Sequence, residues 1–122
     1  NKIITFLGVT FKPNTDDMRE ATSIPMIKYL NKKNSKIKYY DPSGEKDDFK
    51  DLKNVNYFNT ISSACLNADM VILHTEWNDF KLLNFKKLVK KQKFKIYDDV
   101  NFIIPWDAAI GLGSFWFALP IH

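Results

Sequence analysis

The sequence of 122 residues is poor in the side chains that bind metals or form disulfides. It contains one cysteine, Cys65, and two histidines, His74 and His122. A single cysteine excludes an intrachain disulfide framework and any site with several thiolate ligands. The histidines lie far apart in the sequence, without the carboxylate spacing of a zinc site or a catalytic triad. We therefore expect neither a metal site nor a hydrolase, and we expect Cys65 to be a small core residue in a reducing compartment.

Long apolar runs and a uniformly basic surface are also missing. Lys and Arg number 18 against 14 Asp and Glu, and seven lysines fall within residues 81–95, which contain no acid. We interpret this segment as a solvated helix face, with an anionic-polymer or membrane-surface patch as the weaker alternative. Because the positive charge is confined to this one segment, it does not indicate a nucleic-acid partner. The apolar residues of 101–122 are interrupted by Asp107, two prolines and two glycines, so no membrane span is expected.

The composition provides for a buried core, because 45% of the residues are hydrophobic and 15% are aromatic. Strand-like and helix-like patterns alternate along the chain. The expected strands are 3–7, 37–39, 55–58, 70–75 and 94–97, and the expected helices are 24–33, 61–66 and 82–89. Such alternation predicts a parallel sheet with helices on both faces. We predict one α/β domain, residues 1–102, with a mainly parallel sheet of about five strands, followed by a divergent apolar tail, residues 103–122.

Capping residues set the expected helix ends. Ser23 is predicted to be the N-cap of the first helix, with Pro25 in its first turn. Asn34 is predicted to close that helix in the left-handed conformation. Thr60 is predicted to cap the second helix. One apolar stripe defines the third helix, and it consists of Leu82, Phe85, Leu88 and Val89.

The polar loop after the first strand, residues 8–22, is the strongest candidate for a ligand site, because ligands of open parallel sheets bind beyond the carboxyl ends of the strands. It carries Lys12, a point charge for a phosphate, and Arg19, whose guanidinium can fork onto two pyrophosphate oxygens. It lacks G-x-G-x-x-G, the standard dinucleotide fingerprint. The alternative is that both cations only form ion pairs within the loop. The acids available for this are Asp16, Asp17 and Glu20.

Four blocks of the sequence resemble a known family. They are GVTFKPNTDDMREATSIPMIKYL, YYDP, NADMVILHTEWNDF and YDDVN, in this order. Their order and spacing resemble the C-terminal, UDP-binding domain of the UDP-glucose/GDP-mannose dehydrogenase family over about residues 3–102. FKPNTDDMRE is a highly specific phrase, and TEW followed by a Phe resembles the UDP-glucose 6-dehydrogenase branch. The resemblance implies a three-layer α/β/α Rossmann-like domain.

The resemblance also implies roles for single residues. In the family, the Phe-Lys pair of the first loop lies against the nucleotide sugar, so Phe11 and Lys12 are the substrate-binding candidates. The Arg of the D-x-R-E segment approaches the NAD pyrophosphate, which makes Arg19 the cofactor-binding candidate. The loop acids are expected to hold the loop by hydrogen bonds, and Trp77 is expected to pack. No catalytic residue is expected, because the family's catalytic Cys belongs to a domain that is absent here and Cys65 lies outside its motif.

The chain departs from the family pattern near its end. Val100, in Asp98-Asp99-Val100-Asn101, stands where the family commonly has an Arg near the nucleotide. The tail 103–122 does not resemble the usual ending, and we expect it to pack against this domain or a second copy. The chain opens at Asn1 without a signal peptide pattern, and strand-like residues follow at once. We therefore expect it to be a piece of a longer protein.

The function implied is that of a UDP-sugar-binding domain in an NAD-dependent dehydrogenase, which oxidises the C6 alcohol of UDP-glucose to the carboxylate of UDP-glucuronate. NAD would be bound mainly by a domain absent here. The expected partners are UDP-glucose or a related nucleotide sugar, the N-terminal dehydrogenase domains and a second copy in a homodimer. We expect neither a nucleic acid nor a membrane as a partner. The expected location is the cytoplasm. The alternative is a stand-alone interaction module that kept the fold and lost the ligand.

Overall fold

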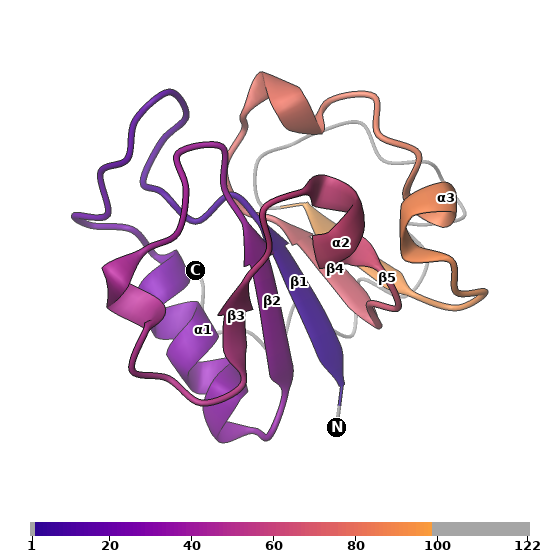
Figure 1. The fold of residues 1–122 in the computed structure, drawn as a ribbon, viewed down its shortest axis with the longest axis horizontal. Helices are drawn as coiled ribbons and strands as arrows, with labels where there is room; N and C mark the ends of the chain where they lie inside the picture. Colours follow the sequence, from indigo (N-terminus) through magenta and orange to yellow (C-terminus); the bar gives the residue numbers. More distant parts are fainter. Residues whose placement is uncertain (1, 99–122) are drawn as a thin grey trace.

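The computed structural model of the chain describes residues 2–98. Within them, five strands alternate with three α-helices and two short 3₁₀ helices (Figure 1). The strands are β1 (Ile3–Leu7), β2 (Lys36–Tyr40), β3 (Val55–Tyr57), β4 (Met70–Leu73) and β5 (Lys95–Asp98). The helices are α1 (Ser23–Lys32), η1 (Asp47–Phe49), α2 (Ile61–Cys65), η2 (Asn78–Phe80) and α3 (Phe85–Val89). The predictions for Val100 and for the tail 103–122 lie outside the described residues.

The five strands form one parallel sheet in the order β3-β2-β1-β4-β5. The chain runs from β1 outwards through β2 to β3, and it then crosses back to place β4 on the other side of β1. Connections therefore leave β1 and β4 in opposite directions, which creates a topological switch point between these two strands. The prediction of a mainly parallel sheet of about five strands is confirmed.

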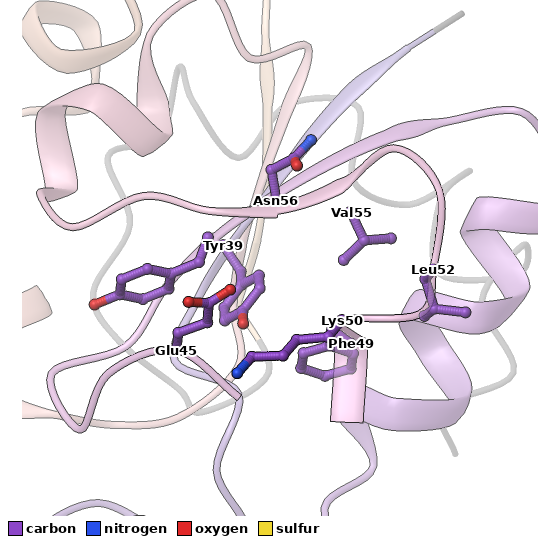
Figure 2. Close-up of a pocket in the computed structure, with 8 residues that line it drawn as sticks. Tyr39, Glu45, Phe49, Lys50, Leu52, Val55 and Asn56 are labelled. Atoms are coloured by element: carbon purple, nitrogen blue, oxygen red, sulfur yellow. The ribbon is translucent and has the colours of Figure 1, made fainter. Parts of the chain in front are cut away.

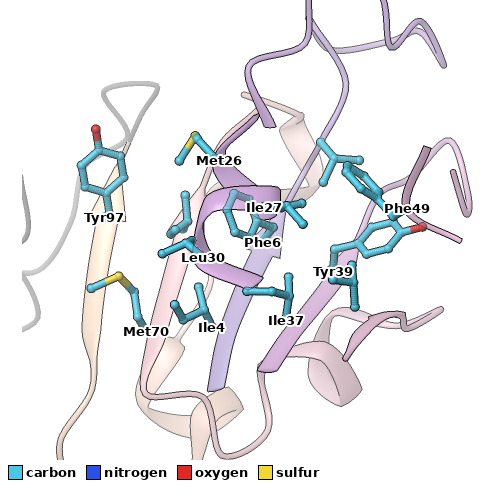
Figure 3. Close-up of a cluster of buried hydrophobic side chains, with 13 residues drawn as sticks. Ile4, Phe6, Met26, Ile27, Leu30, Ile37, Tyr39, Phe49, Met70 and Tyr97 are labelled. Atoms are coloured by element: carbon cyan, nitrogen blue, oxygen red, sulfur yellow. The ribbon is translucent and has the colours of Figure 1, made fainter. Parts of the chain in front are cut away.

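The core on one face of the sheet packs against α1 (Figure 3). Met26, Ile27 and Leu30 of the helix join Phe6 of β1 and Tyr39 of β2 in this cluster, and all five are buried. The three helix residues lie on one stripe of α1, because helical residues three and four apart share a face. Burying each such aliphatic side chain contributes about 1.5–3 kcal/mol relative to leaving it in water.

The core on the opposite face packs against α2 and α3. Cys65 and Val89 from these helices join Leu7, Val71 and Ile96 from the strands, and all five are buried. Neighbouring residues of a strand point to opposite faces, which is why β1 contributes to both cores. Helices thus cover both faces, so the three-layer α/β/α prediction is confirmed, as is the placement of Cys65 in the core.

The start of α1 differs from the prediction. Thr22, not Ser23, is the N-cap, and it makes no side-chain capping hydrogen bond. Ser23 is the first helical residue and is fully buried, and its hydroxyl donates to the carbonyl of Val9 at 2.6 Å. This long-range acceptor takes the hydroxyl that a local cap would have used. The other predicted closures are confirmed, since Asn34 has a φ of +63° and Thr60 Oγ1 accepts from Ser63 N at 3.1 Å.

The third helix is shorter than predicted, and Leu82 is not part of it. Asn84 caps α3 by accepting a hydrogen bond from Lys87 N at 3.2 Å, so the helix can begin only at Phe85. Leu82 has a φ of +63° and a fully exposed side chain. Phe85 and Val89 are buried as the apolar stripe predicted, and the lysines of the helix face solvent.

The strand β4 ends two residues before its predicted end. His74 and Thr75 leave the regular ladder, although His74 N still donates to Leu7 O at 3.0 Å. Both side chains are buried at the carboxyl edge of the sheet, beside the β1–α1 loop. No helix within residues 2–98 is long and apolar enough to cross a membrane.

Candidate functional site

The candidate site lies at the carboxyl ends of β1 and β4, on either side of the switch point. The loop that joins β1 to α1, residues 8–22, leaves the sheet here and is drawn in indigo to purple at the upper left of Figure 1. Open α/β sheets bind ligands at such points, because connections that diverge leave a crevice between them. The position predicted from the sequence is therefore the one that the fold favours.

The first part of this loop, residues 8–10, is held by three buried side chains from different elements, and we call it the loop root. Asp41, directly after β2, accepts a hydrogen bond from Val9 N at 2.8 Å. Ser23, at the start of α1, donates to Val9 O at 2.6 Å. Thr75, after β4, donates to Thr10 O at 2.9 Å. The root is thus connected to the ends of β2 and β4 and to the start of α1.

Both carboxylate oxygens of Asp41 are hydrogen-bonded within the domain. Its Oδ2 binds Val9 N, and its Oδ1 accepts from Ser43 N at 2.9 Å and from Ser43 Oγ at 2.5 Å. In dinucleotide-binding domains, an acid that follows the first glycine-rich turn accepts the ribose hydroxyls. The acid at the end of β2 is fully buried here and serves the loops instead. Together with the missing G-x-G-x-x-G, this argues against a complete dinucleotide site in this domain.

Beyond the root, residues 11–20 form the loop tip, whose side chains are exposed or partly buried. Phe11 is 52% exposed, although it is a large apolar side chain, and Lys12 beside it is exposed as well. The tip is closed by a backbone hydrogen bond from Phe11 N to Asp17 O at 3.1 Å. Thr10 Oγ1 also donates to Lys12 O at 2.9 Å. The predicted substrate-binding pair therefore stands on an ordered, outward-facing turn.

Arg19 is held at the same tip by Asp17. Its Nε donates to Oδ1 at 3.0 Å, its Nη2 donates to Oδ2 at 2.9 Å, and its backbone N donates to Oδ1 at 2.9 Å. These bonds lower the pKa of Asp17 to about 2, and the nearby charge of Lys12 adds to the effect. The ion pair that the sequence offered as an alternative is thus real for Arg19. The ion pair leaves N–H donors of the guanidinium available for a ligand, because the side chain of Arg19 is 89% exposed and has five such donors.

Two side chains that the sequence predicts to pack rather than to react are buried in the core beneath α2 and α3. Trp77 is 8% exposed and packs there, as predicted. Cys65 is fully buried, and its desolvation raises the pKa of the thiol to about 12. A thiol with such a pKa is almost entirely protonated at neutral pH and cannot act as a nucleophile. The described residues contain no cluster of His, Cys, Asp and Glu that could hold a metal ion.

A separate pocket of about 250 Å³ lies over β2 and β3 (Figure 2). The rings of Phe49 and Tyr57 stand edge-on to Tyr39, with ring centres 5.1 and 5.2 Å away. Glu45 and Lys50 add opposite charges to the lining. None of the predicted site residues lines this pocket, so it is not part of the candidate site.

Sequence reasoning missed the residues that hold the root. From the sequence, Asp41 only follows the predicted strand 37–39, Ser23 is predicted to cap a helix, and Thr75 is predicted to belong to the strand 70–75. Their partners lie 32, 14 and 65 positions away in the chain. The blocks YYDP and TEW contain two of the three, so the resemblance singled out the segments without indicating what their side chains contact.

A comparison with protein-family models agrees with this arrangement. Residues 5–105 match the model of the UDP-glucose/GDP-mannose dehydrogenase family, UDP binding domain. The chain belongs to this family. The match includes the β1–α1 loop, the end of β2 and the TEW segment after β4.

Relatives of this UDP-binding domain are found among curated proteins. The chain is 35% identical over 120 residues to the UDP-glucose 6-dehydrogenase of Rickettsia felis, and this alignment covers 97% of the chain and 27% of that protein. It is 42% identical over 81 residues to that of Bacillus subtilis, covering 66% of the chain and 18% of that protein. The chain thus spans about a quarter of the length of the Rickettsia relative. These findings lend no support to a stand-alone interaction module.

Solved structures of the family share the fold. The NDP-N-acetyl-D-galactosaminuronic acid dehydrogenase of Methanosarcina mazei superposes with a TM-score of 0.73 over 92% of the chain and 23% of that structure, at 24% sequence identity. Identity this low shows the fold alone. The UDP-binding domain described here therefore has the Rossmann-like architecture of the dehydrogenases that it resembles.

Proposed function

We propose that this domain binds the diphosphate of a UDP sugar at the tip of the β1–α1 loop. The observation that carries the proposal is the pairing of Phe11 and Lys12 on an exposed turn at the switch point, inside the region that matches the UDP-binding family. A lysine here supplies a positive charge where the diphosphate carries negative charges. The exposed Phe11 ring offers an apolar face for the nucleotide sugar.

Arg19 serves the second nucleotide in this proposal. The resemblance directs this residue to the pyrophosphate of NAD, and the exposed guanidinium has donors left after its bonds to Asp17. The carboxylate of Asp41 is fully buried and hydrogen-bonded to the neighbouring loops, so it is not presented to a ribose, and this domain would contact NAD without forming its main site. When bound, NAD supplies the hydride acceptor for oxidation at C6 of the sugar.

The whole protein is then an NAD-dependent dehydrogenase that converts UDP-glucose to UDP-glucuronate, with its hydride-transfer site in domains outside this chain. The names of the Rickettsia and Bacillus relatives support this substrate. We place the enzyme in the cytoplasm, because the single cysteine is a buried free thiol and no disulfide is needed to hold the fold. The homodimer expected from the sequence is part of the same proposal.

Calorimetric titration of UDP and UDP-glucose into the chain tests the site. Lys12→Ala should remove a charge-assisted contact worth about 1.5–3 kcal/mol, or about tenfold to a hundredfold in affinity. Arg19→Ala should weaken UDP binding less, because it faces the cofactor in this proposal. Lys87→Ala is the matched control, since it removes the same charge from the exposed surface of α3.

Two results would contradict the proposal. One is equal UDP affinity in the wild type and Lys12→Ala at the same salt concentration. The other is an equal loss in Lys12→Ala and Lys87→Ala, which would show that only the net charge of the domain matters.

A further inference from the structure

Burial changes abruptly between two neighbouring residues of the β1–α1 loop. Thr10, the last residue of the root, is fully buried, whereas Phe11, the first residue of the tip, is 52% exposed. The peptide group that joins them is therefore the boundary between the packed domain and the part of the loop that meets solvent. Its orientation determines the direction in which the tip leaves the sheet.

Both ends of this peptide group are hydrogen-bonded. The carbonyl of Thr10 accepts from Thr75 Oγ1 at 2.9 Å, and the N–H of Phe11 donates to Asp17 O at 3.1 Å. A peptide group is planar, so two bonds at opposite ends leave it little freedom to rotate. One bond connects the plane to the end of β4, and the other connects it to the residue that holds Arg19.

A threonine suits this position for two reasons. Its hydroxyl reaches the Thr10 carbonyl, which is inside the protein and needs a donor. Its β-branched side chain has few rotamers, so the hydroxyl is held in place. Thr75 itself is 2% exposed and does not face the solvent in which a ligand would arrive.

We propose that Thr75 is a positioning residue for nucleotide-sugar binding, because it orients the Thr10–Phe11 peptide and so presents Phe11 and Lys12. The inference rests on the proposed function for its consequence in binding. The hydrogen-bonded peptide itself can be tested without any ligand. Through Asp17, the same plane links the substrate pair to Arg19.

The test compares two buried threonines in the chain. Thr75→Val removes the hydroxyl that binds Thr10 O. Thr5→Val removes an equally buried hydroxyl, which donates to Ala64 O at 2.6 Å on the α2 side of the sheet. Thr75→Ser keeps the hydroxyl and tests rescue. Amide exchange followed by NMR reports on the loop, and calorimetry with UDP reports on binding.

We expect both valine variants to lose stability, because each leaves a buried carbonyl without its donor. Only Thr75→Val should raise the exchange rates of the Phe11 and Arg19 amides, by about tenfold, and only this variant should weaken UDP binding, by about tenfold. Thr75→Ser should restore both to within about threefold of the wild type. If Thr75→Val does not fold, Thr75→Ala replaces it, since it places no methyl group against the Thr10 carbonyl.

The inference is overturned if the Phe11 amide exchanges alike in Thr75→Val and Thr5→Val, or if Thr75→Ser fails to restore it. It is also overturned if UDP binds to the wild type and Thr75→Val equally well. Failure of the proposed function would look different: the loop amides would respond to Thr75→Val as expected, while the wild type would not bind UDP or would bind it independently of Lys12.

Discussion

The backbone of Gly8 lies so close to Thr75 that a Cβ added to Gly8 would stand 2.6 Å from Thr75 Cβ and 2.9 Å from its Oγ1. The glycine has a φ of +81°, and its N–H donates to Tyr40 O at 2.8 Å. The absent side chain therefore does two things at once. It permits the left-handed turn at the end of β1, and it leaves space for the threonine that binds the loop root.

Gly8→Ala should destabilise the domain more than Gly44→Ala. Both glycines have positive φ, but a Cβ on Gly44 would meet nothing within 4 Å. Gly44→Ala should therefore lower the free energy of unfolding only through backbone strain, by about 1–2 kcal/mol. Gly8→Ala adds a clash with Thr75 and should cost about 1–3 kcal/mol beyond that. Urea unfolding of both variants measures the difference, and equal losses would mean that Thr75 can move aside without cost.

Asp17 should remain ionised to unusually low pH. Its hydrogen bonds from Arg19 lower its pKa from the ordinary 3.8 to about 2. Because the pKa in the folded state is lowered, the ion pair is present above about pH 4 and is lost as the pH falls through about 2. Carboxyl chemical shifts followed by NMR should show this. In Arg19→Gln the pKa of Asp17 should return towards the ordinary value; an unchanged pKa would show that Arg19 is not its partner in solution.

The thiol of Cys65 should react only when the domain opens. Burial raises its pKa to about 12, so a thiol reagent at pH 8 should modify the folded chain slowly and the urea-unfolded chain at once. The raised pKa has a second consequence. The folded state disfavours the thiolate, so stability should fall as the pH rises from the ordinary 9.0 of a thiol towards 12. Fast modification of the folded chain would contradict the burial of Cys65.

The chain by itself should not oxidise UDP-glucose. The sequence lacks G-x-G-x-x-G, and its one thiol is buried and protonated. Mixing the chain with UDP-glucose and NAD⁺ should therefore produce no NADH absorbance. Turnover that disappears in Cys65→Ser would show both that the chain is a complete enzyme and that this thiol is reactive.

The sequence by itself determined the class of fold and the place of the candidate site. Apolar runs such as Ile3–Leu7 and Met70–Leu73 predicted buried strands, and their alternation with helical patterns predicted a parallel sheet. Local patterns suffice for this because strand and helix preferences depend on neighbouring residues. The long polar loop after the first strand then had to lie at the carboxyl edge, where parallel sheets bind ligands.

Only the tertiary structure decided how that loop is held. Ser23 looks like a helix cap from its neighbours, yet its hydroxyl binds Val9; Asp41 and Thr75 likewise reach partners in other elements. Leu82 fits a helical stripe, but the cap at Asn84 leaves it outside the helix. A buried polar group takes whichever partner the packed strands bring within reach. That choice follows from sheet order and register, which bring together residues far apart in the chain.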